Sequence, residues 1–174
     1  RWRGEPADAI SIRPVFEAAW HDGADGIDWK GKEEDQKAKA WVILDHNIHQ
    51  TPVPTHEKPE AVEVVVERDL DAHGLPPLKG IIDLVRKGGG IVDFKTSARS
   101  PDPDLAAQLH GTQLGVYALL YREATGHKES GFELHFLVKT KEPKLAVVSL
   151  NPVTPVRVRR LVALMESYVR GVED

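Results

Sequence analysis

The chain of 174 residues has ordinary proportions of hydrophobic (41%) and charged (29%) residues, as expected for one soluble domain with its own core. It contains no cysteine, so disulfides, thiolate metal sites and cysteine-ligated iron–sulfur clusters are excluded within these residues. The absence of cysteine favours a reducing compartment, and we expect a cytoplasmic protein. The formal charge of −4 argues mildly against a protein that wraps a polyanion. No apolar run approaches the ~20 residues of a membrane span, so we expect no membrane partner.

The first third of the chain is predicted to be helical. Glycines punctuate the segment between two helical patterns, and a proline-rich connector at Thr51–Thr55 cannot continue a helix. We therefore expect a helical region with its connector at 1–59 and the core of the fold at 60–174. The two predicted helices are Ala7–Trp20 and Glu33–His49.

The core is predicted to contain five strands and two helices. A period of two in Val62, Val64 and Val66 indicates a half-buried strand, and Gly88-Gly89 is the strongest turn signal, which predicts a β-hairpin. These elements predict an α/β fold whose central mixed sheet is flanked by helices. The predicted strands are Ala61–Glu67, Lys79–Lys87, Gly90–Thr96, Phe132–Thr140 and Lys144–Leu150, and the predicted helices are Pro103–Thr125, capped by Asp102, and Pro155–Gly171, capped by Thr154.

Two carboxylates are predicted to face each other across the hairpin. Asp93 and Lys95 are two residues apart in one strand, so both side chains leave the same face. A three-residue loop at Lys87–Gly89 sets a register that places Asp83 directly opposite Asp93. Opposed residues on antiparallel strands have Cβ atoms about 4.5–5.5 Å apart, where two carboxylates repel unless a cation lies between them.

Hard oxygen ligands of this kind fit Mg²⁺ or Mn²⁺. Mg²⁺ prefers one or two carboxylates with waters and substrate phosphate, which leaves positions for a phosphodiester. Such an ion polarises the phosphoryl oxygen and activates water, while Lys95 orients that water or offsets charge in the transition state. The pattern therefore favours metal-dependent phosphodiester hydrolysis, with Asp83, Asp93 and Lys95 as the catalytic residues.

Three short motifs resemble those of the PD-(D/E)XK nuclease superfamily and, within it, of the RecB-like exonuclease branch. Gly80-Ile81-Ile82-Asp83 resembles the G-x-I-D motif, Asp93-Phe94-Lys95-Thr96 the D-x-K-T motif, and Gln113-Leu114-Gly115-Val116-Tyr117 the Q-x-x-x-Y motif. A D-x-K tripeptide alone is uninformative, whereas the ordered set, each on the expected element type, is much more specific. The resemblance covers about residues 60 to 150.

The resemblance implies a restriction-endonuclease-like core and a set of roles. Asp83, Asp93 and the backbone carbonyl of Phe94 are the implied metal ligands, and Lys95 is the implied catalytic lysine. The implied substrate is DNA, single-stranded or with a free end, cut from an end during repair, recombination or phage-type or CRISPR-type processing, with a helicase or recombination partner. The residues implied to face the substrate are Thr96, Gln113 and Tyr117.

Two features depart from that branch. Its members carry a metal-binding His on an upstream helix, and no segment of this sequence matches it. The opening Arg1–Gly4 lacks an initiator Met and resembles the end of a helix, which predicts a truncated start with that His before it; a complete chain would be one ligand short. Several relatives also hold an iron–sulfur cluster, which a chain without cysteine cannot bind.

Alternative interpretations stay open. The chain is a nuclease fold that has lost activity and binds DNA or scaffolds a repair complex, or it is an unrelated α+β domain with structural acids. In the second case Asp93 and Lys95 form a surface ion pair worth at most about 1 kcal/mol, and Tyr117 is a core residue. A solvated surface is the default interpretation for the remaining polar candidates, which are Asp45, His46, His49, His56, Glu63, Glu67, His110, Lys139, Lys141, Lys144, Arg157, Arg159 and Arg160.

Overall fold

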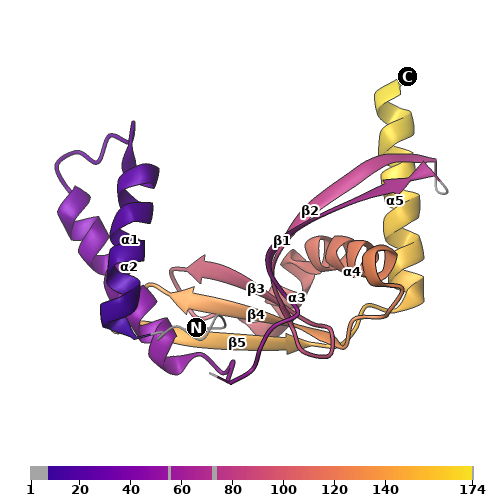
Figure 1. The fold of residues 1–174 in the computed structure, drawn as a ribbon. Coiled ribbons are helices and arrows are strands. Elements are labelled where there is room, and N and C mark those ends of the chain that lie inside the picture. Colours follow the sequence, from indigo (N-terminus) through magenta and orange to yellow (C-terminus); the bar gives the residue numbers. More distant parts are fainter. Residues whose placement is uncertain (1–7, 55, 72–73, 174) are drawn as a thin grey trace. The chain divides into compact units, whose positions relative to one another are not determined.

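The computed structural model describes residues 8–54, 56–71 and 74–173, and Figure 1 shows its elements in chain order. Five strands form one mixed sheet in the order β1-β2-β3-β4-β5, flanked by helices, which confirms the predicted α/β fold. The elements are α1 (Ala9–Ala24), α2 (Glu33–Gln50), β1 (Ala61–Leu70), β2 (Leu75–Arg86), β3 (Gly90–Ser97), α3 (Pro103–Leu109), α4 (Gly111–Thr125), β4 (Gly131–Val138), β5 (Lys144–Leu150) and α5 (Pro155–Glu173).

The described residues cluster into two compact units. Unit 1 contains α1 and α2 together with Lys95–Ser100 and Phe136–Ala146, which include the last residues of β3 and β4 and the first of β5. Unit 2 contains Lys58–Phe94, Pro101–His135 and the chain from Val147 through α5. The predicted boundary after residue 59 stays a prediction.

The two helices of unit 1 pack through aromatic side chains. The ring of Phe16 lies 5.8 Å from that of Trp20 and 5.3 Å from that of Trp41, centroid to centroid, and Arg13 lies over Trp41 at 4.5 Å. Asp8 caps α1 by accepting from the Ser11 NH at 2.8 Å. The predicted first residue of this helix, Ala7, and the expected helix end at Arg1–Gly4 lie outside the described residues.

In unit 2, β1 and β2 form an antiparallel ribbon that extends beyond the predicted strands. Sequence patterns begin the second strand at Lys79 because Pro76 and Pro77 cannot donate to a ladder. The structure instead begins β2 at Leu75, which pairs with Leu70, and the register shifts between Arg68 and Leu70. This irregular end of the ribbon accommodates the two prolines.

The residue pairs of the β2–β3 hairpin follow the predicted register, and the predicted pair of Asp83 and Asp93 lies beyond the last of them. Leu84 pairs with Val92, Val85 with Ile91 and Arg86 with Gly90. Gly88 and Gly89 adopt φ of 86° and 78°, a region that favours glycine. The turn chemistry of the sequence therefore fixed which residues of the two strands face each other.

The helix predicted over Pro103–Thr125 is two helices, α3 and α4. His110 interrupts it with φ −96° and ψ −1°, and the NH of His110 bonds to the carbonyl of Ala106. Gly111 follows directly, and glycine is a poor helix former. The predicted caps are confirmed, because Asp102 accepts from the Leu105 NH and Thr154 accepts from the Arg157 NH. Gly126 ends α4 in the left-handed conformation.

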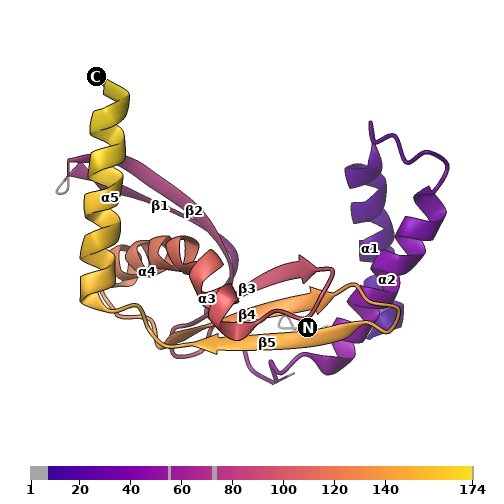
Figure 2. The same ribbon diagram turned by 180° about the vertical axis from the view of Figure 1, so that it is seen from behind.

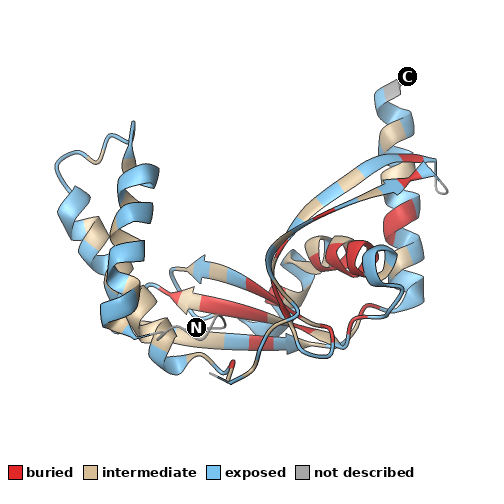
Figure 3. Ribbon diagram, in the orientation of Figure 1, coloured by how far each residue is buried: buried red, intermediate tan, exposed pale blue. Residues whose placement is uncertain are grey.

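Helices α4 and α5 supply the core of unit 2. Figure 3 shows the run of buried residues along α4, and Figures 1 and 2 show α5 beside α4 and the β1–β2 ribbon. One face of α5 is apolar: Val162 is buried in a cluster with Leu70, Leu75 and Leu119, against which further α5 side chains pack.

A buried ion pair fixes the chain before α5. Glu129 is 1% exposed and accepts two hydrogen bonds from Arg122, at 2.8 and 2.7 Å. Glu129 also accepts from the NH of Val153, whose carbonyl accepts from Arg122. These contacts join the end of α4 to the segments before β4 and α5.

Candidate active site

Asp93 lies buried against α4 and is 2% exposed. Its Oδ1 accepts from Nε2 of Gln113 at 3.1 Å and from the Tyr117 hydroxyl at 3.4 Å. Gln113 Nε2 also lies 2.9 Å from the Tyr117 hydroxyl. The two α4 residues are four apart and therefore share one helix face, which the structure turns toward β3.

Asp83 meets the strand of Asp93 where the hairpin ladder ends. The β2–β3 pairing stops at Leu84 and Val92, and one step further along the strands Oδ2 of Asp83 accepts from the backbone NH of Phe94 at 2.8 Å. The ladder thus gives way to a contact between a side chain and the main chain. This contact holds the Asp83 carboxylate beside the backbone that carries Asp93.

The phenol of Tyr117 responds to both carboxylates. Burial raises its pKa above the usual value, and the charges of Asp93 and Asp83 raise that pKa further, while the hydrogen bond with Gln113 acts in the opposite direction. The hydroxyl therefore stays protonated at neutral pH and remains able to donate. The Tyr117 hydroxyl therefore lies close enough to both Asp83 and Asp93 for their charges to raise its pKa.

Lys95 and Thr96 continue β3 beyond Asp93. Lys95 is partly buried and Thr96 is exposed, and both belong to the β3 segment of unit 1. Phe94, between the two charged residues, is 37% exposed. The structure therefore brings Asp93, Gln113 and Tyr117 into direct contact within unit 2. Asp83 contacts the backbone of Phe94, and Lys95 and Thr96 follow Phe94 in the same strand.

The donor set fits a divalent cation of the Mg²⁺ or Mn²⁺ class. Within the described residues no three or more His, Cys, Asp or Glu side chains gather as a metal site. Asp83 and Asp93 are two acids at this end of the hairpin. Two carboxylates with open positions are the arrangement that Mg²⁺ accepts, since it retains waters and substrate oxygens. Gln113 and Tyr117 are neutral donors, so they orient Asp93 without cancelling its charge.

The sequence patterns missed a polar cluster on β4. His135 is 0% exposed, its Nε2 lies 2.8 Å from Oε2 of Glu133, and its ring meets the edge of the Phe94 ring at 5.4 Å. The His135 contact holds the pKa of the Glu133 carboxyl below its usual value, and Arg86 acts in the same direction. The only sequence signal was two polar residues, two apart, within an otherwise apolar strand.

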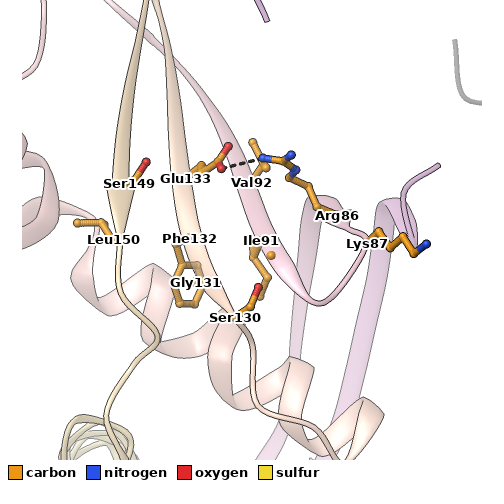
Figure 4. Close-up of a pocket in the computed structure, with 11 residues that line it drawn as sticks. Arg86, Lys87, Ile91, Val92, Ser130, Gly131, Phe132, Glu133, Ser149 and Leu150 are labelled. Atoms are coloured by element: carbon orange, nitrogen blue, oxygen red, sulfur yellow. Dashed lines mark hydrogen bonds and ion pairs between the residues drawn. The ribbon is translucent and has the colours of Figure 1, made fainter. Parts of the chain in front are cut away.

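Arg86 and Glu133 also line a cavity of about 260 Å³. Figure 4 shows the guanidinium of Arg86 next to the carboxylate of Glu133. Nη1 of Arg86 lies 2.8 Å from Oε1 of Glu133. Ser130, Gly131 and Ser149 line the same cavity, whereas Asp83 and Asp93 do not. Its two central charges neutralise each other, so this cavity is chemically distinct from the pair of aspartates.

Two acids thus lie at the end of the hairpin ladder, next to a helix that presents Gln113 and Tyr117. The sequence matches the PD-(D/E)XK nuclease superfamily over residues 3–173. The chain belongs to this superfamily.

Among the described helices, none combines the length and the apolar character needed to cross a membrane.

A solved structure shares the fold at low sequence identity. A crystal structure from Eubacterium rectale, described as "Putative exonuclease", matches with a TM-score of 0.66 at 19% identity, covering 97% of this chain and 66% of that chain. This chain thus spans slightly less than two thirds of that structure, and the likeness is one of fold. A second structure, described as SSO0001, has a TM-score of 0.45 and 14% identity, with 90% and 85% of the two chains covered. No curated protein matches the sequence.

Proposed function

We propose that this chain is a DNA exonuclease module of the RecB-like branch, dependent on Mg²⁺ or Mn²⁺. The observation that carries the proposal is the linked set of contacts in which Asp83 binds the Phe94 NH while Gln113 and Tyr117 hold the neighbouring Asp93. Gln113 and Tyr117 contact Oδ1 of Asp93 and hold this carboxylate in one orientation. Membership of a nuclease superfamily supports the phosphodiester as the bond that is cut.

Each site residue has a proposed role. Asp83, Asp93 and the Phe94 carbonyl hold the ion, which when bound supplies a Lewis acid for the phosphoryl oxygen. Lys95 orients the attacking water and offsets negative charge in the transition state. Gln113 and Tyr117 fix the orientation of Asp93, and with Thr96 they face the substrate.

The proposed substrate is a DNA single strand or a duplex with a free end. The described relative from Eubacterium rectale supports an exonuclease, and the resemblance of the three motifs to the RecB-like branch supports the same activity. A helicase or recombination protein is the proposed partner, in DNA repair or a related processing reaction. The proposed substrate and partner rest on family likeness. The two aspartates act at the phosphodiester, whereas DNA sequence is read by separate contacts to the edges of bases.

A nuclease assay tests the proposal. Labelled linear and circular single strands are incubated with the chain and Mn²⁺, and the linear strand is expected to be degraded while the circle, which has no end, persists. Lys95→Ala is expected to lower the rate at least 100-fold, on the scale of losing one transition-state contact. Lys87→Ala, an exposed lysine of the hairpin loop, is the matched control and retains the wild-type rate.

Three outcomes would contradict parts of the proposal. Equal cleavage of circle and line identifies an endonuclease. Cleavage that survives Lys95→Ala unchanged removes the role of that lysine. DNA binding without cleavage at any divalent metal concentration would support an inactive module that holds DNA.

A further inference from the structure

Helix α5 has an exposed stripe beside its buried face. The buried face carries Val158, Val162, Met165 and Val169 against the core of unit 2. The stripe consists of Arg157, Arg160, Leu164 and Tyr168, which are spaced three and four residues apart and therefore align along one side of the helix. Leu164 is 62% exposed and Tyr168 is 74% exposed. The stripe is thus cationic at the start of the helix and aromatic further along.

The cationic end of the stripe borders a groove of about 260 Å³ at the start of α4. Arg157 and Arg160 line the groove together with Gln108, Thr112 and other residues, among which there is no Asp or Glu. Neither guanidinium forms an ion pair with the described part of the chain. Two positive charges therefore meet in a concave surface without a neutralising carboxylate.

A glycine at the start of α4 permits this arrangement. A Cβ on Gly111 would lie 2.9 Å from Nη2 of Arg157, so the missing side chain lets the guanidinium lie against the first turn. Thr112 lines the groove, and the next residue, Gln113, contacts Asp93. The groove and the candidate active site therefore share the first turn of α4.

A third arginine of the same helix lies in a different setting. Arg159 lines a groove on another side of α5, together with the carboxylate residues Glu123 and Glu166. It has the same charge and the same high exposure as Arg157 and Arg160. Substitution of Arg159 is thus a matched control, because it removes one positive charge from α5 outside the groove that Arg157 and Arg160 line.

We propose that the stripe of α5 binds a single strand of DNA, with Arg157 and Arg160 contacting phosphates and Tyr168 stacking on a base. Proteins that hold single strands combine a positively charged groove with exposed aromatic rings, because phosphates bind cations and every base presents a π face. The choice of DNA rests on the proposed function, whereas the pairing of arginines with an exposed ring rests on the stripe alone. The strand held there reaches the end of α4 that carries Gln113.

The phosphate contacts are tested by the salt dependence of binding. Fluorescence anisotropy is measured with a labelled oligothymidine of about 12 nucleotides, within the span of one single-strand site, and without divalent metal so that no cleavage occurs. Each lost phosphate contact lowers the slope of log K against log salt by about 0.7. The double variant Arg157→Gln, Arg160→Gln is therefore expected to lose about 1.4, and Arg159→Gln is expected to keep the wild-type slope.

The stacking contact is tested with a strand that lacks bases. Tyr168→Ala is expected to weaken binding of the oligothymidine by about 5-fold to 150-fold, the range that corresponds to the loss of one stacked base. The same substitution is expected to leave binding of an abasic strand of equal length unchanged. Tyr168→Phe retains the ring and is expected to restore the affinity for the oligothymidine.

The outcomes separate this inference from the proposed function. A slope that falls equally in Arg159→Gln would assign the effect to net charge and overturn the groove. Wild-type protein that does not bind the oligothymidine, or Tyr168→Ala that binds it normally, would overturn the stripe. If Asp83→Asn binds the oligothymidine with the wild-type slope but does not cut it, the result supports both the α5 stripe and the proposed nuclease activity. If the wild-type protein binds with the expected slopes but never cuts, the result refutes only the proposed activity.

Discussion

The backbone NH of Phe94 donates to Oδ2 of Asp83 at 2.8 Å, one step beyond the last residue pair of the β2–β3 ladder. The Asp83 carboxylate therefore has two tasks that are chemically separable. Accepting the NH requires only an oxygen atom, whereas binding a divalent cation requires the negative charge. Substitutions at Asp83 can distinguish the two.

Asp83→Asn retains an oxygen acceptor and removes the charge, so we expect it to abolish Mn²⁺ binding with little change in stability. Asp83→Ala removes both and is expected to lower the free energy of unfolding by about 1 kcal/mol as well, the typical contribution of a hydrogen bond. Calorimetric Mn²⁺ titration and urea unfolding measure the two effects. Mn²⁺ binding by Asp83→Asn at wild-type affinity would exclude this aspartate as a ligand.

Tyr117 is expected to make the protein less stable in alkali. Burial first, and then Asp93 and Asp83, raise its pKa in the folded state, so the unfolded chain releases this proton at lower pH. The stability that Tyr117 contributes is fully present below the unfolded pKa, about 10, and is lost as pH rises through the folded pKa.

Tyr117→Phe is therefore expected to flatten the fall of unfolding free energy above about pH 10, the unfolded pKa of tyrosine. Some slope should persist because burial also raises the pKa of Tyr121. Urea unfolding between neutral and alkaline pH measures the effect, with Tyr168→Phe as a control for the loss of one hydroxyl. A Tyr117→Phe curve parallel to that of the wild type would refute the assignment.

The buried ion pair of Glu129 with Arg122 is expected to contribute strongly to the free energy of unfolding of unit 2. Removing one partner of a buried pair leaves an uncompensated charge, so Glu129→Ala should cost about 3–5 kcal/mol. Glu123→Ala, on the exposed side of α4, is expected to change stability by less than about 0.5 kcal/mol. Urea unfolding compares the two variants, and a loss in Glu129→Ala as small as that expected for Glu123→Ala would show that the ion pair contributes little.

Gly80 lies where β2 approaches α4. A Cβ there would come within 2.7 Å of Cδ1 of Leu120, so Gly80→Ala is expected to destabilise the fold by about 1–3 kcal/mol through overpacking. Gly171 in α5 has no atom within 4 Å of such a Cβ, and Gly171→Ala should instead stabilise by up to about 1 kcal/mol. Thermal unfolding gives both signs, and a neutral Gly80→Ala would mean that Leu120 moves aside freely.

Local patterns determined the hairpin and the ends of several helices. Gly88 and Gly89 favour positive φ, so their turn fixed the register of β2 and β3, and a period of two assigned the strands. Asp102 and Gly126 cap their helices because the required groups are neighbours in the sequence. These features depend on residues a few positions apart, which is why the sequence alone predicted them, together with the fold class and the nuclease superfamily.

Other features depended on contacts between distant parts of the chain. Gln113 and Tyr117 reach Asp93 across 20 and 24 residues, and Arg86 meets Glu133 across 47. The break at His110 and the ribbon through Pro76 and Pro77 likewise contradict the local preferences from which one long helix and a shorter strand were expected. The sequence by itself determined which residues lie on which element, and only the tertiary structure decided which side chains meet, because packing fixes contacts that no short-range pattern encodes.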